Sequence, residues 1–326
     1  DVFIFAQDRL GGWVEGGDVI EPVGFWLTDE KRARYLPRMI EALTYQGVVY
    51  GVPLNFKSIA LIRNADLAPS APETTDQLVA IAKANSNPGA GNYGLVYEYA
   101  NPDMQAALMH AFGGGVFDAD LNPVLNSPAN IASFELMLRW REIDKILLPE
   151  PNGSLVLSLF NDRKAPFAIS GPWFMGEVSP DVNVSVSPLP TVPGAGPIQP
   201  WLLVEGAFVT AASKNPREAF LFAEFLTSDA AATRLAVECR QLPSVASVYA
   251  LAQIADDPVL SGFRAQLDQS QVLPNAPEMA LFWSPGDIAM KQVIRAGRDP
   301  QDALNEAQGV LVASISAMRR VDEGEQ

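Results

Sequence analysis

Residues 1–14 read DVFIFAQDRLGGWV, and the fold can be read outward from this stretch. The apolar run VFIFA predicts a buried strand that ends abruptly in Asp8 and Arg9. In a parallel α/β sheet, ligands bind beyond the carboxyl ends of the strands, so these two side chains are candidate ligand-binding groups. A carboxylate accepts two hydroxyl hydrogens and a guanidinium donates from a rigid fork, which suits the vicinal hydroxyls of a sugar. The alternative, that the pair only caps a helix, stays open on the residues alone.

Strand and helix patterns alternate along the rest of the chain, which predicts an α/β protein. Further strands are predicted for GVVYGVPL, SIALIRN, YGLVYEY, APFAIS, VNVSVSPLP and GAFVTA. Several helices are predicted to begin with a short polar residue followed by proline, because this pair satisfies free N–H groups and suits the first helical turn. These starts are Ser127-Pro128, Asn215-Pro216, Asp257-Pro258 and Asp299-Pro300.

The composition describes a packed protein with an acidic balance of charge. The 326 residues suffice for one large domain or two ordinary ones, and 48% of them are hydrophobic. The net charge of −15 argues against binding to nucleic acid or to an anionic membrane surface, since both attract basic residues. No run of about 18 apolar residues occurs, so no membrane-spanning helix is expected.

The chain offers no convincing catalytic, cofactor or metal motif. GAGNYG (residues 89–94) matches a dinucleotide-binding glycine pattern, but a helix pattern precedes it and a strand pattern follows, which reverses the required context. DADLNP lacks the later glycine and glutamate of a calcium loop. His110 and Cys239, the only residues of their types, lie on apolar helix patterns and are predicted to be packed rather than reactive. We therefore expect no catalytic residue, no metal site and no cofactor.

Two tryptophans follow turn-forming residues and are candidates for contact with a sugar. In AISGPWF, Gly171 and Pro172 fix a turn that leaves Trp173 at its tip. In PNAPEMALFWS, a proline-punctuated loop precedes Phe282 and Trp283. Aromatic faces bury the C–H faces of sugar rings while the hydroxyl edges stay hydrogen-bonded. The alternative for each tryptophan is a place in the hydrophobic core.

Six segments, in their order and spacing, resemble the maltose/maltodextrin-binding proteins, the solute-binding components of ABC sugar importers. They are DVFIFAQDRLGGW, YGVPLN, FAISGPW, TAASKNPREAFLFAEFL, LPNAPEMALFW and GRDPQDALNEAQ. The resemblance implies a two-lobed periplasmic-binding-protein fold of type II. Each lobe is then a mixed sheet flanked by helices, and a hinge motion closes the ligand cleft between the lobes. The implied first lobe is 1–54 and 206–253, the second is 59–201 and 259–326, and the hinge crossovers are 55–58 and 203–206.

The resemblance also assigns ligand-binding residues by position. Asp8 and Arg9 fall on the family's hydroxyl-binding pair. Trp173 and Trp283 fall on the stacking tryptophans of the second lobe, and Phe5 replaces a tryptophan near the sugar.

Several positions depart from the family's pattern. Lys57 stands where the family has a sugar-binding glutamate, and Asp287 stands where it has an arginine. We hypothesise that these two are a charge swap and pair with each other; drift to a different sugar is the alternative. Asp103 and Met104 replace an aromatic pair, so a stacking surface is lost, and Ser284 replaces a tyrosine.

The start of the chain departs most from the family. The family carries about fifty further residues before this point, and a sheet that lacks its central strand would expose apolar edges. The first lobe is therefore expected to be truncated at its N-terminus. Three explanations remain open: an excised fragment, a segment supplied by another chain, or a domain within a larger protein such as a permease fusion.

The function predicted on this basis is non-catalytic binding of maltose, maltodextrin or a related oligosaccharide. The sugar would be delivered to the permease subunits of an ABC importer, outside the cytoplasm in the periplasm, with tethering to the inner membrane or fusion to a permease as variants. One alternative is a sugar-binding-like domain that regulates a permease and has altered or lost ligand binding. Another is a glycosidase using Asp8 and Asp287, which needs a carboxyl that stays protonated, whereas Arg9 is expected to lower the pKa of Asp8.

Overall fold

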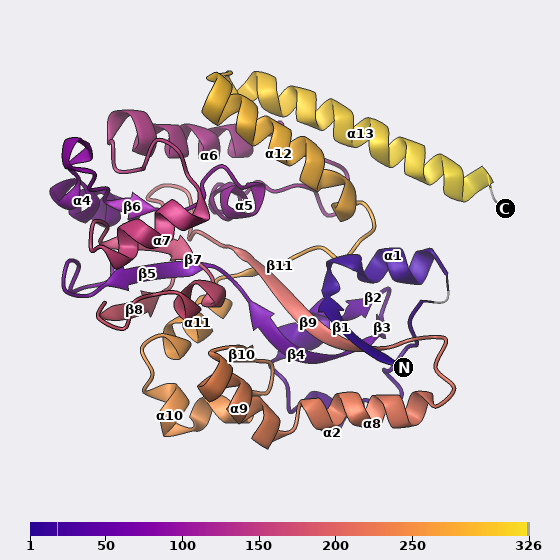
Figure 1. Ribbon diagram of the computed structural model, residues 1–326. Coiled ribbons are helices and arrows are strands. Elements are labelled where there is room, and N and C mark those ends of the chain that lie inside the picture. Colours follow the sequence, from indigo (N-terminus) through magenta and orange to yellow (C-terminus); the bar gives the residue numbers. More distant parts are fainter. Residues whose placement is uncertain (18, 325–326) are drawn as a thin grey trace. The chain divides into compact units, whose positions relative to one another are not determined.

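The computed structural model describes residues 1–17 and 19–324, and the chain divides into two compact units. Unit 1 contains Asp1–Ser58, Gly171–Gly176 and Trp201–Ala280, and unit 2 contains Ile59–Ser170, Glu177–Pro200 and Leu281–Gln326. Each unit is therefore assembled from three separate stretches of sequence. Figure 1 labels most of the helices and strands of both units.

Unit 1 is built on a mixed five-stranded sheet. Its main path runs through β1 (Val2–Ala6), β9 (Trp201–Val209), β4 (Gly51–Lys57) and β10 (Leu242–Pro243), and β11 (Gln271–Val272) adds to β9. The β9·β11 pair is parallel, whereas β1 and β4 pair with β9 in antiparallel register. The assumption of a parallel sheet around β1 is therefore wrong, although Asp8 and Arg9 do follow the carboxyl end of that strand.

The helices of unit 1 are mostly short. Besides a two-stranded ribbon of β2 (Thr44–Tyr45) and β3 (Val48–Val49), the unit contains α1 (Leu10–Glu15), α2 (Asp29–Arg32), α3 (Pro37–Ala42), α8 (Pro216–Leu226), α9 (Asp229–Cys239), α10 (Ala252–Ala255) and α11 (Leu260–Leu267). The 3₁₀ helices are η1 (Gln7–Arg9), η4 (Pro172–Gly176) and η5 (Ala246–Ala250). Trp13 of α1 packs its ring against Phe3 and Phe208, at centroid distances of 5.2 Å for both, so α1 covers one face of the sheet.

Unit 2 is a second α/β layer structure with its own sheet. The strand order is β6 (Leu95–Val96), β7 (Phe167–Ser170), β5 (Ala60–Asn64) and β8 (Val184–Ser187). The β6·β7 pair is parallel and the other two pairs are antiparallel, so this sheet is also mixed. Every residue of β5 is buried, as expected of an inner strand covered on both faces.

Long helices surround the sheet of unit 2. They are α4 (Thr75–Asn85), α5 (Pro102–Ala111), α6 (Pro128–Leu138), α7 (Gly153–Asn161), α12 (Met279–Ala296) and α13 (Pro300–Gly324), with the short helices η2 (Pro88–Ala90) and η3 (Arg139–Ile143), the latter a π-helix that continues α6. Figure 1 shows α12 and α13 lying side by side, and Arg298 pairs with Glu306 at the turn between them. Trp140, Tyr99 and Phe160 are among the largest fully buried side chains of this unit.

The helices predicted to begin with a short polar residue followed by proline do begin at or near these positions. Ser127 accepts a hydrogen bond from the backbone N–H of Asn130, which is the predicted cap of α6. The Asp257 carboxylate accepts from Val259 and Leu260, and Asp299 accepts from Gln301 and Asp302. Asn215 makes no such bond, yet α8 still begins at Pro216, because the fixed φ of proline already suits the first turn.

The unit boundaries differ from the expected lobe boundaries at two places. Residues 259–280 fall in unit 1 because β11 pairs with β9 there, and Gly171–Gly176 also fall in unit 1. The predicted crossovers at 55–58 and 203–206 lie close to the points where the chain passes between units, at Ser58 and Trp201. Their role as hinges stays a prediction.

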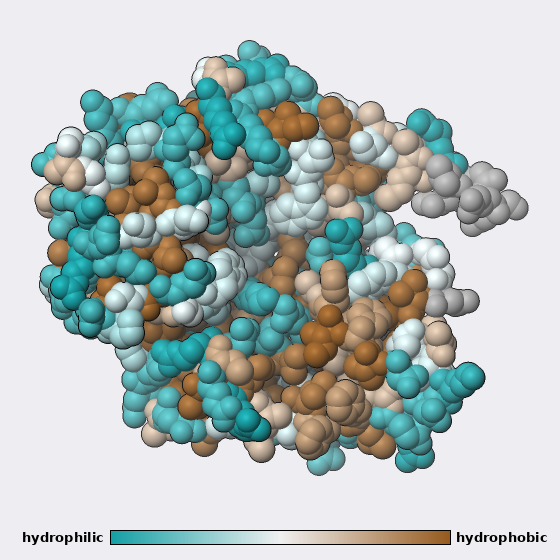
Figure 2. All heavy atoms as spheres, in the orientation of Figure 1, coloured by the Kyte–Doolittle hydropathy of each residue, from teal (hydrophilic) through white to brown (hydrophobic). Residues whose placement is uncertain are grey.

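One side of unit 1 exposes apolar surface. β1 is an edge strand, and its Ile4 and Phe5 are 47% and 49% exposed. The outward residues of α8 include Phe222 and Phe225, which are 53% and 66% exposed. Figure 2 shows apolar atoms gathered over the part of unit 1 that carries these two elements. Uncovered apolar edges of this kind are sites of association.

Candidate functional site

Gln7 anchors the segment that carries Asp8 and Arg9. Its side-chain amide donates to the backbone carbonyls of Leu202 and Leu273, at 3.2 and 3.4 Å. The Val204 backbone N–H donates to the Gln7 carbonyl oxygen of the side chain at 2.7 Å. Because Gln7 is fully buried, these bonds hold η1 against the start of β9. The following two side chains are thereby fixed at the carboxyl end of β1.

Asp8 and Arg9 form a close pair with unequal exposure. Their side chains are 17% and 52% exposed, and the Arg9 Nε lies 3.7 Å from an Asp8 carboxylate oxygen. Burial raises the pKa of Asp8, and the nearby Arg9 charge lowers it by less than burial raises it. The expectation that Arg9 would lower the pKa of Asp8 overall is therefore wrong, because the desolvation of the carboxyl outweighs the charge.

Lys57 has a partner that the sequence did not suggest. Its ammonium lies 2.6 Å from the carboxylate of Glu205, and the two side chains are 33% and 25% exposed. Lys57 ends β4, and Glu205 lies opposite Asn55 in β4 and opposite Ala6 in β1. The pair therefore joins two neighbouring strands at the end of the sheet.

Asp287 also has a local partner, Lys291, one turn further along α12 at 2.5 Å. The hypothesised charge swap assumed that Lys57 and Asp287 neutralise each other. Each of them has an ion-pair partner within its own unit, which is Glu205 for Lys57 and Lys291 for Asp287. The pairing of Lys57 with Asp287 stays an untested prediction.

Four charged residues thus gather at one end of the unit 1 sheet. Asp8 and Arg9 follow β1 after one intervening residue, Lys57 ends β4, and Glu205 lies in β9 opposite the last residue of β1. We call this group the charged end, defined as Asp8, Arg9, Lys57 and Glu205. Its carboxylates accept hydroxyl hydrogens and its cations donate to hydroxyl oxygens, which is the chemistry of polyol recognition.

Two of the predicted aromatic residues also belong to unit 1. Phe5 of β1 is half exposed and packs its ring against Trp13 at a centroid distance of 5.6 Å. Trp173 of η4 is 48% exposed, so it is not a core residue. Its indole lies back over Gly171, where an added Cβ would come within 2.0 Å of the ring. The glycine therefore sets the position of the indole.

Replacing Gly171 with alanine is expected to push the Trp173 indole out of its place. If this indole contacts a sugar, we expect the affinity for maltotriose to fall about fivefold to tenfold, which corresponds to about 1 kcal/mol of ring contact. Isothermal calorimetry measures the change. Gly176→Ala is the matched control, because a Cβ at Gly176 meets no atom within 4 Å. If Gly171→Ala and Gly176→Ala bind maltotriose with equal affinity, Trp173 does not contact the sugar.

Unit 2 supplies the other two predicted residues, both from α12. Trp283 and Asp287 are four residues apart on one helix, so they share a face. The ring of Trp283 lies 5.4 Å from that of Phe282, and Phe282 itself is buried. Trp283 is thus backed by a buried aromatic neighbour and is only partly buried itself.

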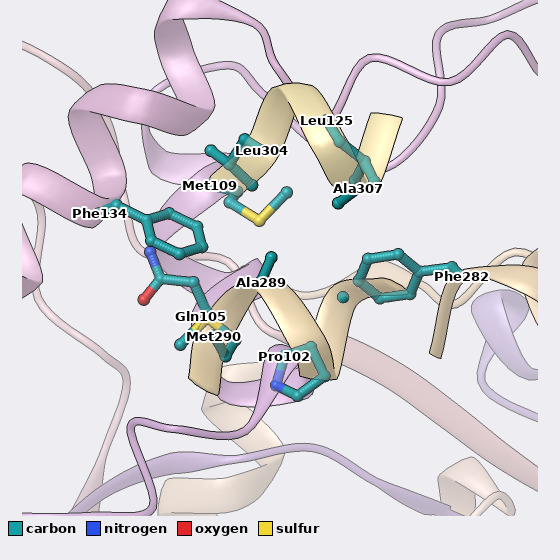
Figure 3. Close-up of a pocket in the computed structure, with 11 residues that line it drawn as sticks. Pro102, Gln105, Met109, Leu125, Phe134, Phe282, Ala289, Met290, Leu304 and Ala307 are labelled. Atoms are coloured by element: carbon teal, nitrogen blue, oxygen red, sulfur yellow. The ribbon is translucent and has the colours of Figure 1, made fainter. Parts of the chain in front are cut away.

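An apolar pocket lies among α5, α6, α12 and α13 within unit 2. Met109, Phe134, Phe282 and Leu304 are among the residues that line it, and Figure 3 shows their side chains turned toward one another. The free volume is about 10 Å³, too little for more than a single water molecule. This pocket is a packed core and has no room for a sugar ring.

Asp103 is a titratable group in the first turn of α5. Burial raises its pKa to about 6. Between about pH 4 and pH 6, the unfolded chain is ionised at this residue while the folded chain holds the proton. The unfolded state then binds fewer protons, so this residue lowers stability as the pH rises through that window.

Asp103→Asn is therefore expected to raise the free energy of unfolding by about 3 kcal/mol at pH 7 and by less than about 1 kcal/mol near pH 4. Urea unfolding at the two pH values measures the difference. Asp302→Asn is the matched control, because Asp302 lies in the first turn of α13 but is exposed. A gain at pH 7 no larger than that of the control would contradict the prediction.

His110 and Cys239, the histidine and the cysteine of the chain, both lie outside the charged end. His110 is buried, its Nδ1 lies 2.6 Å from the Gln199 carbonyl oxygen, and burial lowers its pKa. The prediction that it is a packed residue is confirmed. Cys239 is exposed, so the prediction of a buried thiol is wrong; it lies at the last position of α9, where the helix face meets solvent. Within residues 1–17 and 19–324, no group of three or more potential metal ligands comes together.

Sequence reasoning missed Gln7 and Glu205. Glu205 carried a signal, since it is the only charged residue in the apolar strand WLLVEGAFV. Gln7 precedes the candidate pair directly, and a polar residue at the end of an apolar strand could also have been noticed. What the sequence could not supply is their partners, which lie 148 to 266 residues away.

Two mixed-sheet α/β units, each built from several stretches of chain, define the class of two-lobed solute-binding proteins of type II. The family described as bacterial extracellular solute-binding protein matches residues 1–233, and the chain belongs to this family. The helices of the described residues include none that is long and apolar enough to cross a bilayer.

Individual relatives agree with this assignment. A maltotriose-binding protein of Pyrococcus abyssi is 28% identical over 94% of this chain and 68% of its own length. A maltooligosaccharide ABC transporter solute-binding lipoprotein of Streptococcus pneumoniae is 24% identical over 97% of this chain and 76% of its own. A cyclo/maltodextrin-binding protein, crystallised with maltotetraose, is 30% identical, with a TM-score of 0.88 over 98% of this chain and 83% of its own. These relatives are binding proteins by name.

Proposed function

We propose that this chain is a non-catalytic receptor that binds a maltose- or maltodextrin-type oligosaccharide and delivers it to an ABC importer. The observation that carries the proposal is the likeness, over nearly the whole chain, to a maltodextrin-binding protein whose structure contains maltotetraose. The candidate groups on each unit are of the types that a sugar requires.

The two kinds of candidate group serve different parts of a sugar. The charged end of unit 1 hydrogen-bonds hydroxyl groups, and it is polar enough to replace the water that a free sugar holds. Phe5, Trp173 and Trp283 offer half-buried aromatic faces that cover the apolar faces of the rings. A sugar needs both, because each ring has an apolar face and a hydroxyl edge.

The proposed partners and location follow the relatives. A receptor of this kind presents its sugar to the permease subunits of an ABC transporter, to which it is either docked or fused. It works outside the cytoplasm, in the periplasm, free or tethered to the inner membrane. The family description and the lipoprotein named among the relatives support this location. Closure of the two lobes on the sugar is part of the proposal, and a decrease in radius of gyration on adding sugar would test it.

Calorimetric titration with maltose, maltotriose and trehalose tests the proposal. We expect a maltodextrin to bind with Kd in the micromolar range, about −8 kcal/mol, and to be recovered intact after prolonged incubation. Recovery matters because the raised pKa of Asp8 leaves a carboxyl that ionises less readily than usual, as a glycosidase acid must. If shorter sugars are released from the maltodextrin, the protein is a glycosidase and the proposed receptor function is wrong.

A second candidate is a domain that regulates a permease and has lost sugar binding. The exposed apolar surface of β1 and α8 favours it, because such a surface associates with other protein segments. Absence of heat with every sugar, from a protein shown to be folded, would support this candidate over the first.

A further inference from the structure

We propose that Glu205 is a sugar-binding residue that sets ligand specificity, and that Lys57 is the positioning residue that holds its carboxylate in place. The inference rests on the proposed function, which it deepens by adding one group to the site. Its basis is the geometry of the Lys57–Glu205 pair at the charged end.

Glu205 lies in the inner strand β9. The residues on either side, Val204 and Gly206, are buried, and β9 is paired on both edges, with β1 and β4. The Glu205 side chain is mostly buried, with only 25% of its surface exposed. A partly buried ion pair is a weak source of stability compared with apolar residues of the same size. Stability alone is therefore a poor reason for an acid in this strand.

Only one oxygen of the Glu205 carboxylate is engaged among the described residues. The Lys57 ammonium donates to Oε1 at 2.6 Å, and in the described part of the chain Oε2 accepts no hydrogen bond. The ammonium keeps the carboxylate in one orientation and offsets its charge. An oriented carboxylate with one oxygen unused is a ready acceptor for a hydroxyl hydrogen.

Glu205 also lies next to the segment that carries the candidate pair Asp8 and Arg9. Glu205 lies opposite Ala6, which is followed by the segment that carries Asp8 and Arg9. Gln7 ties that segment to Val204, the residue that precedes Glu205. The carboxylates of Asp8 and Glu205 are therefore set at the same end of the same sheet. A ligand hydrogen-bonded by Asp8 and Arg9 would have its next hydroxyl groups near Glu205.

The test compares Glu205→Gln with a matched variant, Glu224→Gln. Glu224 pairs with Lys31 at 2.9 Å on the α2–α8 surface, with side-chain exposures of 19% and 33% that resemble those of the Lys57–Glu205 pair. Both variants remove one charge from a lysine-paired glutamate of unit 1. We expect Glu205→Gln to weaken maltotriose binding about 10- to 100-fold, as the loss of a charged hydrogen bond does, and Glu224→Gln to change it less than about twofold.

Deoxy sugars separate a direct contact from a structural effect. Maltose analogues that lack the 2-, 3- or 6-hydroxyl of one ring are titrated against the wild type and Glu205→Gln. For the hydroxyl that Glu205 binds, the wild type loses affinity for the analogue and the variant loses none further. If removing each hydroxyl in turn weakens binding by the same factor in Glu205→Gln as in the wild type, Glu205 contacts none of these hydroxyl groups and acts only on the structure. This result overturns the inference.

Two further variants keep the result interpretable. Glu205→Asp retains the charge if Glu205→Gln fails to fold, and it is expected to bind more weakly than the wild type because the carboxylate is withdrawn by one methylene. Lys57→Met should weaken binding in the same direction by a smaller factor. If the wild type binds maltotriose and Glu205→Gln binds it with the same affinity, this inference is wrong and the proposed function stands. Absence of binding by the wild type overturns the proposed function together with it.

Discussion

Replacing Trp283 with alanine is expected to weaken maltotriose binding about 30- to 100-fold. An indole face that covers a sugar ring removes on the order of 100 Å² of apolar surface from water, which stabilises the complex by about 2.5 kcal/mol. Trp283 suits this role because it is partly buried, lies on a long helix and is backed by the ring of Phe282. Calorimetry measures the affinity, and the quenching or shift of tryptophan fluorescence on adding sugar reports the contact.

The control for Trp283→Ala is an exposed aromatic residue outside the candidate site. Phe225 on α8 is 66% exposed, and Phe225→Ala should leave sugar affinity unchanged. Thermal unfolding of both variants separates a lost contact from a lost fold. If Trp283→Ala binds maltotriose as tightly as the wild type does, the stacking role of α12 is wrong, and with it the position assigned by resemblance.

Local signals in the sequence predicted most of the secondary structure. Ser127 and Pro128 marked the start of α6, and the apolar run after Asp1 marked β1, because capping and strand alternation depend on neighbouring residues. The YGLVYEY pattern was less reliable, since only Leu95 and Val96 pair as a strand. Strand length depends on the partner that the strand finds, and that partner lies far away in the sequence.

The candidate site could be predicted only in part, for the same reason. Asp8 and Arg9 were found because they follow an apolar strand closely, with only Gln7 between. The partner of Lys57 was missed because Glu205 is 148 residues away, and only the β4–β9 register brings the two together. Lys57 is thus accompanied by a carboxylate on the neighbouring strand, Glu205 of β9.

Charge states were the least predictable property. The sequence placed Arg9 beside Asp8 and so suggested a lowered pKa, whereas the fold buries the carboxyl and raises its pKa. The burial of a side chain depends on residues from many segments of the chain, so two neighbouring residues in the sequence do not predict it. The same holds for Cys239, whose apolar neighbours suggested burial although the last position of α9 is exposed.

Asp8→Asn is the second variant expected to have a large effect, with maltotriose affinity falling about 10- to 100-fold. The amide keeps the size of the carboxyl but loses the charge that strengthens its hydrogen bonds to hydroxyl groups. Stability should move the other way. The ionised carboxyl is disfavoured by burial in the folded state, so the neutral amide is expected to raise the free energy of unfolding at neutral pH.

This opposition between binding and stability is the feature that a merely structural Asp8 would not show. Asp229→Asn is the matched control, because Asp229 pairs with Arg34 at 3.2 Å on the surface and should change neither property. The pH profile adds an independent check. Because the pKa of Asp8 is raised, wild-type affinity should begin to fall at a higher pH than for an ordinary aspartate as the solution is acidified, whereas the Asp8→Asn variant should not show this step. A variant that loses stability and affinity together would mean that Asp8 holds η1 in place and does not itself bind the sugar.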